Sequence, residues 1–189
     1  MRVGIFGGSF DPIHNTHLRI VKEVIGKKLV DEVWVMPCKE HAFGKRSVIF
    51  DDRVEMVRLA VDGLERVRVS LFESGIDGVT YTYKTMGLLK EKYPEYEFLW
   101  IVGSDIPRVI NKWKNYDELL REIEFVVFER EDYPIENKFG MRIKGAIRDN
   151  VDGASSTEIR QCVQNGDSLI GLVPGAVEKY IKRKGLYKL

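Results

Sequence analysis

The chain has 189 residues, a formal net charge of +1 and a hydrophobic content of 44%. This length is enough to bury a core without disulfide or metal staples, and the near-neutral charge argues against a protein that coats nucleic acid or a membrane surface. The two cysteines, Cys38 and Cys162, lie far apart and form no disulfide framework, and the strand-like N-terminus does not resemble a signal peptide. We expect one cytoplasmic domain over residues 1–189 with no nucleic-acid or membrane partner, as a monomer or a homo-oligomer.

Short apolar runs alternate along the chain with longer runs of helical periodicity. The expected strands are residues 3–6, 33–36, 67–72, 98–102 and 125–128, with a weaker sixth at 142–146. The expected helices lie around 18–25, after a cap at Asp51 or Asp52, at 82–93, around 119–120, at 156–164 and at 175–184, where Gly185 caps the end. This alternation predicts an α/β fold: a Rossmann-like, doubly wound parallel sheet of about five or six strands, with helices on both faces and further helices at the C-terminal end.

A glycine pair, Gly7 and Gly8, directly follows the first predicted strand and precedes a helix. Glycine lets the backbone approach a ligand closely, and a helix N-terminus offers unpaired N–H groups and a positive dipole end. Strand, glycine loop and helix start together indicate a phosphate site. The loop matches neither the Walker A motif nor the dinucleotide fingerprint, and a simple tight turn is an equally good interpretation of the glycines alone.

Two of the three histidines, His14 and His17, stand between this loop and the helix. Imidazole can donate hydrogen bonds to phosphate oxygens, and its charge is tunable near neutral pH. Zinc-binding helices usually space histidines four residues apart and add a carboxylate or cysteine, which is missing here, so we expect no protein-held metal. The alternatives to a phosphate role are therefore metal chelation and a purely structural pair.

The stretch GGSFDPIHNTH, residues 7–17, resembles the HxGH-containing motif of the nucleotidyltransferase α/β-phosphodiesterase superfamily, with Thr16 in place of the usual glycine. In that superfamily both histidines contact the nucleoside triphosphate. The resemblance implies catalytic roles for His14 and His17 and implies ATP contacts from the loop that precedes them. Those loop residues are Gly7, Gly8, Ser9 and Phe10, of which Ser9 and Phe10 are also expected to touch the second substrate.

A second motif, GASSTEIR at residues 153–160, combines a helix cap at Ser155 or Ser156 with an acidic first turn and an arginine. Taken alone, it is read most simply as a capped surface helix. It resembles the SSTxIR motif of the same superfamily, and this resemblance implies that Ser156, Thr157 and Arg160 bind ATP phosphates, with Arg160 counted among the catalytic residues.

Four further stretches resemble the nicotinate and nicotinamide mononucleotide adenylyltransferases within that superfamily, so that the likeness runs nearly end to end. They are TYTYKTMGLLKEKYP at 80–94, LWIVGSDIPRVINKWKNYDELL at 99–120, FEREDYP at 128–134 and VPGAVEKYIKRKGLY at 173–187. The resemblance implies that Gly103 and Asp105 bind ATP. It also implies a mononucleotide site that contains Tyr81, Thr82, Thr85, Trp113 and Arg130, and a phosphate contact from the 39–46 loop, for which we choose Lys45. Core packing of Trp113 and helix capping by Asp105 are the simpler alternatives.

The reaction implied is attack of the 5′-phosphate of nicotinate or nicotinamide mononucleotide on the α-phosphorus of ATP, with pyrophosphate leaving. Mg²⁺ is expected to arrive with the ATP phosphates, because it prefers phosphate oxygens and water to a full protein cage. Two rival interpretations are another superfamily enzyme, such as a pantetheine-phosphate adenylyltransferase or a cytidylyltransferase, and a non-catalytic nucleotide-sensing domain.

Overall fold

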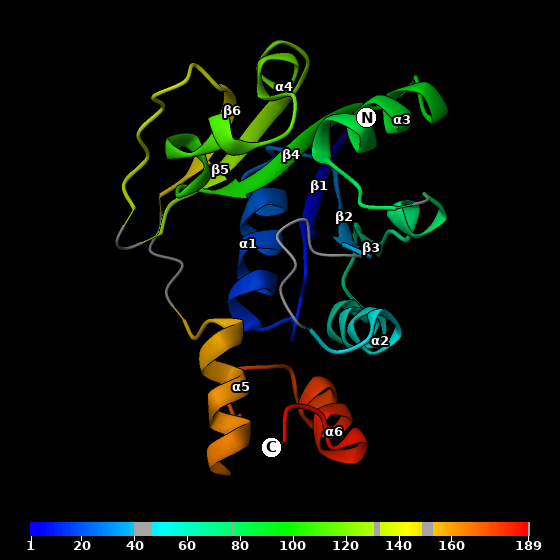
Figure 1. Ribbon diagram of the computed structural model, residues 1–189, viewed down its shortest axis with the longest axis vertical. Helices are drawn as coiled ribbons and strands as arrows, with labels where there is room; N and C mark the ends of the chain where they lie inside the picture. Colours follow the sequence, from blue (N-terminus) through cyan, green and yellow to red (C-terminus); the bar gives the residue numbers. More distant parts are fainter. Residues whose placement is uncertain (40–46, 77, 131–132, 149–152, 189) are drawn as a thin grey trace.

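The computed structural model describes residues 1–39, 47–76, 78–130, 133–148 and 153–188 (Figure 1). The strands are β1 (Arg2–Gly8), β2 (Glu32–Pro37), β3 (Val67–Val69), β4 (Glu97–Gly103), β5 (Glu124–Phe128) and β6 (Arg142–Ile147). The α-helices are α1 (Asn15–Gly26), α2 (Phe50–Val61), α3 (Thr82–Lys92), α4 (Tyr116–Glu122), α5 (Ser156–Asn165) and α6 (Gly175–Lys184). The short 3₁₀ turns are η1 (Phe72–Gly75), η2 (Ile106–Arg108) and η3 (Ile110–Lys112).

The strands form one sheet in the order β3-β2-β1-β4-β5-β6, and every neighbouring pair is parallel. The chain first builds outward from β1 through β2 to β3, and then crosses to the other side of β1 to place β4, β5 and β6. Because the direction of winding reverses between β1 and β4, the carboxyl ends of these two strands border a crevice. The predicted Rossmann-like, doubly wound sheet is confirmed, including its weak sixth strand.

Apolar residues on the two faces of the sheet form two separate cores. Along β1, Val3 and Ile5 point into one core and Phe6 points into the other. The core that contains Phe6 also takes buried residues from α1, α2, α5 and α6, whereas the other takes them from α3 and α4. Figure 1 accordingly shows α3 and α4 at one end of the view and α5 and α6 at the opposite end.

Helix α1 brings the histidine pair to the crevice, because its apolar positions fix how it lies on the sheet. Ile20, Val21, Val24 and Ile25 fall on one side of the helix and are all buried. Their burial against the sheet anchors the C-terminal half of α1 and leaves its first turn at the carboxyl end of β1. The N-terminal amides of α1 therefore face the crevice.

Strand β3 ends earlier than the sequence predicts. The expected strand at residues 67–72 is confirmed only over Val67–Val69, and Ser70 makes one further backbone hydrogen bond, to the carbonyl of Val35, at 2.8 Å. The register that pairs Val35 with Val69 would next require a donor at Pro37, which has no N–H group. The chain leaves the sheet there and turns into η1.

The start of α2 also differs from the prediction. Ile49 occupies the cap position, and Asp51 and Asp52 lie within the first turn instead of capping the helix. Asp52 is buried and accepts a hydrogen bond of 2.7 Å from the hydroxyl of Tyr180 on α6. Its carboxylate thus links two helices that lie far apart in the sequence, a role that local sequence patterns do not report.

Candidate active site

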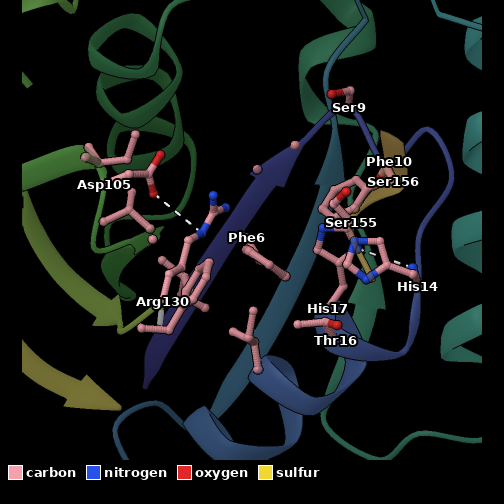
Figure 2. Close-up of a pocket in the computed structure, with 18 of the residues that line it drawn as sticks. Phe6, Ser9, Phe10, His14, Thr16, His17, Asp105, Arg130, Ser155 and Ser156 are labelled. Atoms are coloured by element: carbon pink, nitrogen blue, oxygen red, sulfur yellow. Dashed lines mark hydrogen bonds and ion pairs between the residues drawn. The ribbon is translucent and has the colours of Figure 1, made fainter. Parts of the chain in front are cut away.

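A pocket of about 580 Å³ opens at the carboxyl ends of β1, β4 and β5 (Figure 2). Its walls come from the loop after β1, the first turn of α1, the ends of β4 and β5, and the segment before α5. The predicted site residues that line it are Gly7, Gly8, Ser9, Phe10, His14, His17, Gly103, Asp105, Trp113, Arg130 and Ser156. Segments more than 140 residues apart in the chain thus meet around one cavity, as the two motifs suggested.

The glycine pair of β1 makes room for two aromatic side chains in the pocket. A Cβ atom on Gly7 would lie 2.7 Å from the ring of Trp100, and one on Gly8 would lie 3.1 Å from the ring of Phe10. Phe10 itself has a positive φ of 47°. Its ring packs edge-on against His17, with 5.1 Å between the centroids. A side chain at either glycine would displace an aromatic ring that lines the cavity, so a tight turn alone does not account for these glycines.

The two histidines form a stacked pair at the N-terminus of α1. Their ring centroids are 3.7 Å apart and their planes are inclined by 31°. The backbone amide of His14, the N-cap residue, donates to Nδ1 of His17 at 3.2 Å. Because Nδ1 of His17 accepts this bond, the proton of its neutral ring lies on Nε2, which is then a donor. Nδ1 of His14 is buried and has no hydrogen-bond partner among the residues that the structure describes.

Burial and neighbouring charge keep both rings neutral at physiological pH. Burial lowers the pKa of His14 to about 4, with a further lowering from the positive charge of Arg130 and a partial opposing effect of Glu158. The pKa of His17 falls well below its usual value, again mainly through burial and then through His14 and Arg130. The positive charge of Arg130 contributes to both shifts and also favours an anion beside the pair.

A second helix N-terminus closes the pocket beside the histidines. Ser155 is the N-cap of α5, and its hydroxyl accepts the amide of Glu158 at 3.2 Å. The carboxylate of Glu158 accepts the amide of Ser155 at 2.6 Å, and this hydrogen bond is the main cause that lowers the pKa of Glu158. Ser156 donates through its hydroxyl to the carbonyl of Pro12 at 2.9 Å, which ties α5 to the loop after β1.

On the opposite wall, Asp105 and Arg130 face each other across Gly103. Nε of Arg130 lies 3.6 Å from Oδ1 of Asp105, an atom that is buried and makes no hydrogen bond within the described residues. A Cβ atom on Gly103 would collide with both side chains. Asp105 makes no side-chain cap bond to the following 3₁₀ turn, so its carboxylate stays available to a ligand in the pocket.

Some predicted site residues lie outside the pocket wall. Arg160 donates from Nη1 to the carbonyl of Asp11 at 2.8 Å and from Nη2 to the hydroxyl of Thr157 at 3.2 Å, so both residues support the loop. Thr85 is fully buried in α3 and donates to Oε1 of Glu73 at 2.7 Å. Tyr81 and Thr82 are found at the start of α3, outside the wall. Lys45 falls outside the described residues.

The sequence prediction missed several lining residues, above all Thr16, Trp100, Tyr133 and Gly153. One signal could have found Trp100. It lies in β4 beside β1, and Gly7 on β1 has no side chain to cover the Trp100 ring. Gly153 is the first residue of the GASSTEIR motif, but its place in the pocket wall depends on its close packing against Thr16, which the local sequence does not report.

The described residues contain no group of three or more His, Cys, Asp or Glu side chains placed to hold a metal ion. In the same part of the chain, no helix is both long enough and apolar enough to cross a membrane.

Comparison with known proteins identifies the family of the chain. A family model described as cytidylyltransferase-like matches residues 5–162. A probable nicotinate-nucleotide adenylyltransferase of Bacillus licheniformis is 35% identical over 99% of this chain and 98% of its own length, and the nicotinate-nucleotide adenylyltransferase of Bacillus subtilis is 34% identical with the same coverage.

A solved structure shows the same fold. The nicotinic acid mononucleotide adenylyltransferase of Plasmodium falciparum, complexed with NaAD, superposes with a TM-score of 0.84 at 24% identity and covers 98% of this chain and 97% of its own. The sequence resemblance is therefore confirmed. The chain belongs to the cytidylyltransferase-like nucleotidyltransferases and, among them, to the nicotinate-nucleotide adenylyltransferase family.

Proposed function

We propose that the chain transfers the adenylyl group of MgATP to nicotinate mononucleotide, giving nicotinate adenine dinucleotide and pyrophosphate. Family membership over nearly the whole chain supports the reaction, and the names of the Bacillus relatives support nicotinate over nicotinamide. The observation that carries the proposal is the stacked pair of neutral histidines at the N-terminus of α1, which lies beside the N-terminus of α5 in the wall of one pocket. Donors of this kind, converging from two helix ends, suit a chain of phosphates.

The chemistry needs positioning more than proton transfer. The attacking 5′-phosphate is already an anion, so no general base has to be generated at the nucleophile. Negative charge builds up on the β-phosphate as the bond to the α-phosphorus breaks. In our proposal, Nε2–H of His17 and the His14 ring donate to these oxygens, and the amides at the start of α5 hold the far end of the triphosphate.

The other lining residues are assigned either to the adenosine of ATP or to the mononucleotide. We assign Asp105 and Gly103 to the adenosine side, because the Asp105 carboxylate, whose Oδ1 pairs with Arg130 but makes no hydrogen bond within the described residues, can accept a ribose hydroxyl, and Gly103 lets the backbone approach closely. We assign Trp113 and Arg130 to the mononucleotide side, where an indole face suits a planar cationic pyridine ring. Lys45, Tyr81, Thr82 and Thr85 remain predictions from the family resemblance for that side.

Mg²⁺ belongs in this scheme as part of the substrate. The described residues offer no carboxylate cage, and their donors are hydrogen-bonding groups suited to phosphate oxygens. Mg²⁺ usually keeps its waters and binds through substrate phosphates, so the MgATP complex fits these walls. We also assign the reaction to the cytoplasm, a proposal supported by the free thiols of Cys38 and Cys162.

The test is pyrophosphate release from ATP and Mg²⁺, with nicotinate mononucleotide, nicotinamide mononucleotide and phosphopantetheine as parallel acceptors. We expect the highest kcat/KM with nicotinate mononucleotide. A preference for the amide form would correct the substrate, and turnover with phosphopantetheine alone would retain the family and refute the acceptor. ATP binding without turnover on any acceptor would favour the nucleotide-sensing alternative.

A further inference from the structure

A buried carboxylate beside the active site is held by a tyrosine that follows the last helix. The hydroxyl of Tyr187 donates to Oδ1 of Asp11 at 2.8 Å. Asp11 is only 6% exposed and lies three residues before His14 in the loop after β1. Neither residue lines the pocket, so we expect this pair to affect the reaction through the loop.

The loop after β1 is also held by contacts other than the Asp11 carboxylate. Nη1 of Arg53 donates to the carbonyl of Ser9 at 2.8 Å, and Phe10 and Ile13 are buried in the core. Arg160 holds the carbonyl of Asp11 at 2.8 Å and Ser156 holds that of Pro12 at 2.9 Å, both from α5. The Asp11 carboxylate meets only two more described groups: the amide of Val48 at 3.4 Å, and Nη1 of Arg160 at 4.0 Å from Oδ2. The Tyr187 hydroxyl therefore makes the shortest contact to this carboxylate.

We propose that Tyr187 and Asp11 form a positioning pair that holds the loop after β1 and, through it, sets the placement of the His14 and His17 rings. The expected effect on kcat rests on the proposed function. The expected effect on the placement of the histidine rings rests on the geometry alone. His14 follows Pro12 by two residues, and its backbone amide is the group that orients His17. A displacement of the loop therefore moves both rings together. Donors to a transition state must be placed within about 0.5 Å to be effective.

The chain contains a matched control for this pair. Tyr180 on α6 donates to Oδ1 of Asp52 at 2.7 Å, and Asp52 is 8% exposed, so bond type, length and acceptor burial are close to those of the first pair. Asp52, however, belongs to α2 and not to the loop that carries His14. Tyr180→Phe therefore removes the same kind of hydrogen bond without releasing the loop.

The experiment compares Tyr187→Phe with Tyr180→Phe in the full chain. Each loses one hydrogen bond, so we expect both melting temperatures to fall by a similar few degrees, about 2–4 °C. For Tyr187→Phe we expect kcat to fall about tenfold or more, while KM for the mononucleotide changes less than twofold, because a small misplacement of the histidines weakens transition-state contacts first. For Tyr180→Phe we expect kcat within twofold of the wild type. Equal kcat in the two variants would overturn the proposal.

A second readout needs no turnover. The chain has three histidines, so imidazole ¹⁵N resonances in the substrate-free protein can be assigned by substitution. We expect the signals of His14 and His17 to shift in Tyr187→Phe and to stay in place in Tyr180→Phe. Unshifted signals in Tyr187→Phe would refute the positioning role whatever the substrate is. A wild-type protein with no turnover on any acceptor would instead refute the proposed function, and the NMR comparison would still decide this inference.

Substitution of the acceptor gives an independent check. Asp11→Asn keeps an oxygen that can accept the Tyr187 hydroxyl, whereas Asp11→Ala removes the acceptor. We expect Asp11→Asn to retain kcat within about threefold of the wild type and Asp11→Ala to match or exceed the loss in Tyr187→Phe. Equal losses in the two Asp11 variants would show that the carboxylate charge, and not the hydrogen bond, matters, and would contradict the proposed pair.

Discussion

Replacement of His17 by alanine tests the proposed chemistry most directly. The change removes the Nε2–H donor from the pocket and also the acceptor of the His14 amide, a bond of 3.2 Å. Loss of one preorganised donor to a developing oxyanion typically lowers kcat by about 10²–10³-fold, which corresponds to about 2.7–4 kcal/mol of transition-state stabilisation. We expect a loss in this range for pyrophosphate release at saturating substrates.

The stability cost of the same change should be much smaller. One lost hydrogen bond costs about 0.5–1.5 kcal/mol, and a chain of this size loses about 2–4 °C of melting temperature for each kcal/mol. Removal of a ring that packs against Phe10 adds to this cost. We therefore expect a folded variant whose melting temperature falls by several degrees and whose kcat falls by two orders of magnitude or more.

The control lies in the same helical turn. Asn15 donates from Nδ2 to the carbonyl of Gly171 at 2.8 Å and does not line the pocket. Asn15→Ala should lower the melting temperature to a similar extent and leave kcat within twofold. If folded His17→Ala keeps kcat within about threefold of the wild type, the imidazole does not contact the leaving phosphates and the argument from the stacked pair fails.

Three further outcomes are expected. The pKa of His14 lies at about 4 in the folded state and near 6.5 in the unfolded chain, so the unfolded chain binds more protons between these pH values and the free energy of unfolding falls as pH drops from 6.5 towards 4. In His14→Asn, urea unfolding should show a shallower pH dependence of this free energy, by up to about 3 kcal/mol over that window. A pH dependence equal to that of the wild type would refute the assigned shift. Trp113→Ala should raise KM for the mononucleotide more than KM for ATP, whereas equal effects with lost stability would favour a packing role. Gly103→Ala should raise KM for ATP, because the new methyl group displaces Asp105 and Arg130, and an unchanged KM would show that the adenosine lies elsewhere.

The sheet and the histidine pair were predictable because their signals are local. Strand and helix periodicity specify which face of each element is buried, and alternating elements specify a parallel sheet whose polar loops collect at one edge. His14 and His17 stand at a helix start directly after β1, so chain connectivity alone brings them to that edge. The early end of β3 depended on Pro37 in the neighbouring strand, which only the register reveals.

Residues whose partners lie far away in the chain were not predictable in the same way. Arg160 stays a predicted phosphate contact, and its guanidinium also donates to the carbonyl of Asp11, which lies 149 residues away. Thr85 stays a predicted mononucleotide contact, and its hydroxyl donates to the buried carboxylate of Glu73. In both cases the residue type fits a binding role, and the tertiary hydrogen bond decides where the side chain lies.

The depressed pKa values of the histidines describe the site without its ligand, and this explains how neutral rings can serve a highly charged substrate. Burial and Arg130 disfavour a proton on His14, since a second positive charge there would be poorly solvated and only partly compensated by Glu158. A bound triphosphate reverses the sign of that local field, and an adjacent anion raises the pKa of an imidazole. The charge of the pair is therefore coupled to the presence of phosphate. An empty pocket avoids the cost of buried cations, and in a filled pocket a raised pKa would add positive charge to rings that already donate at the position where the leaving group becomes most negative.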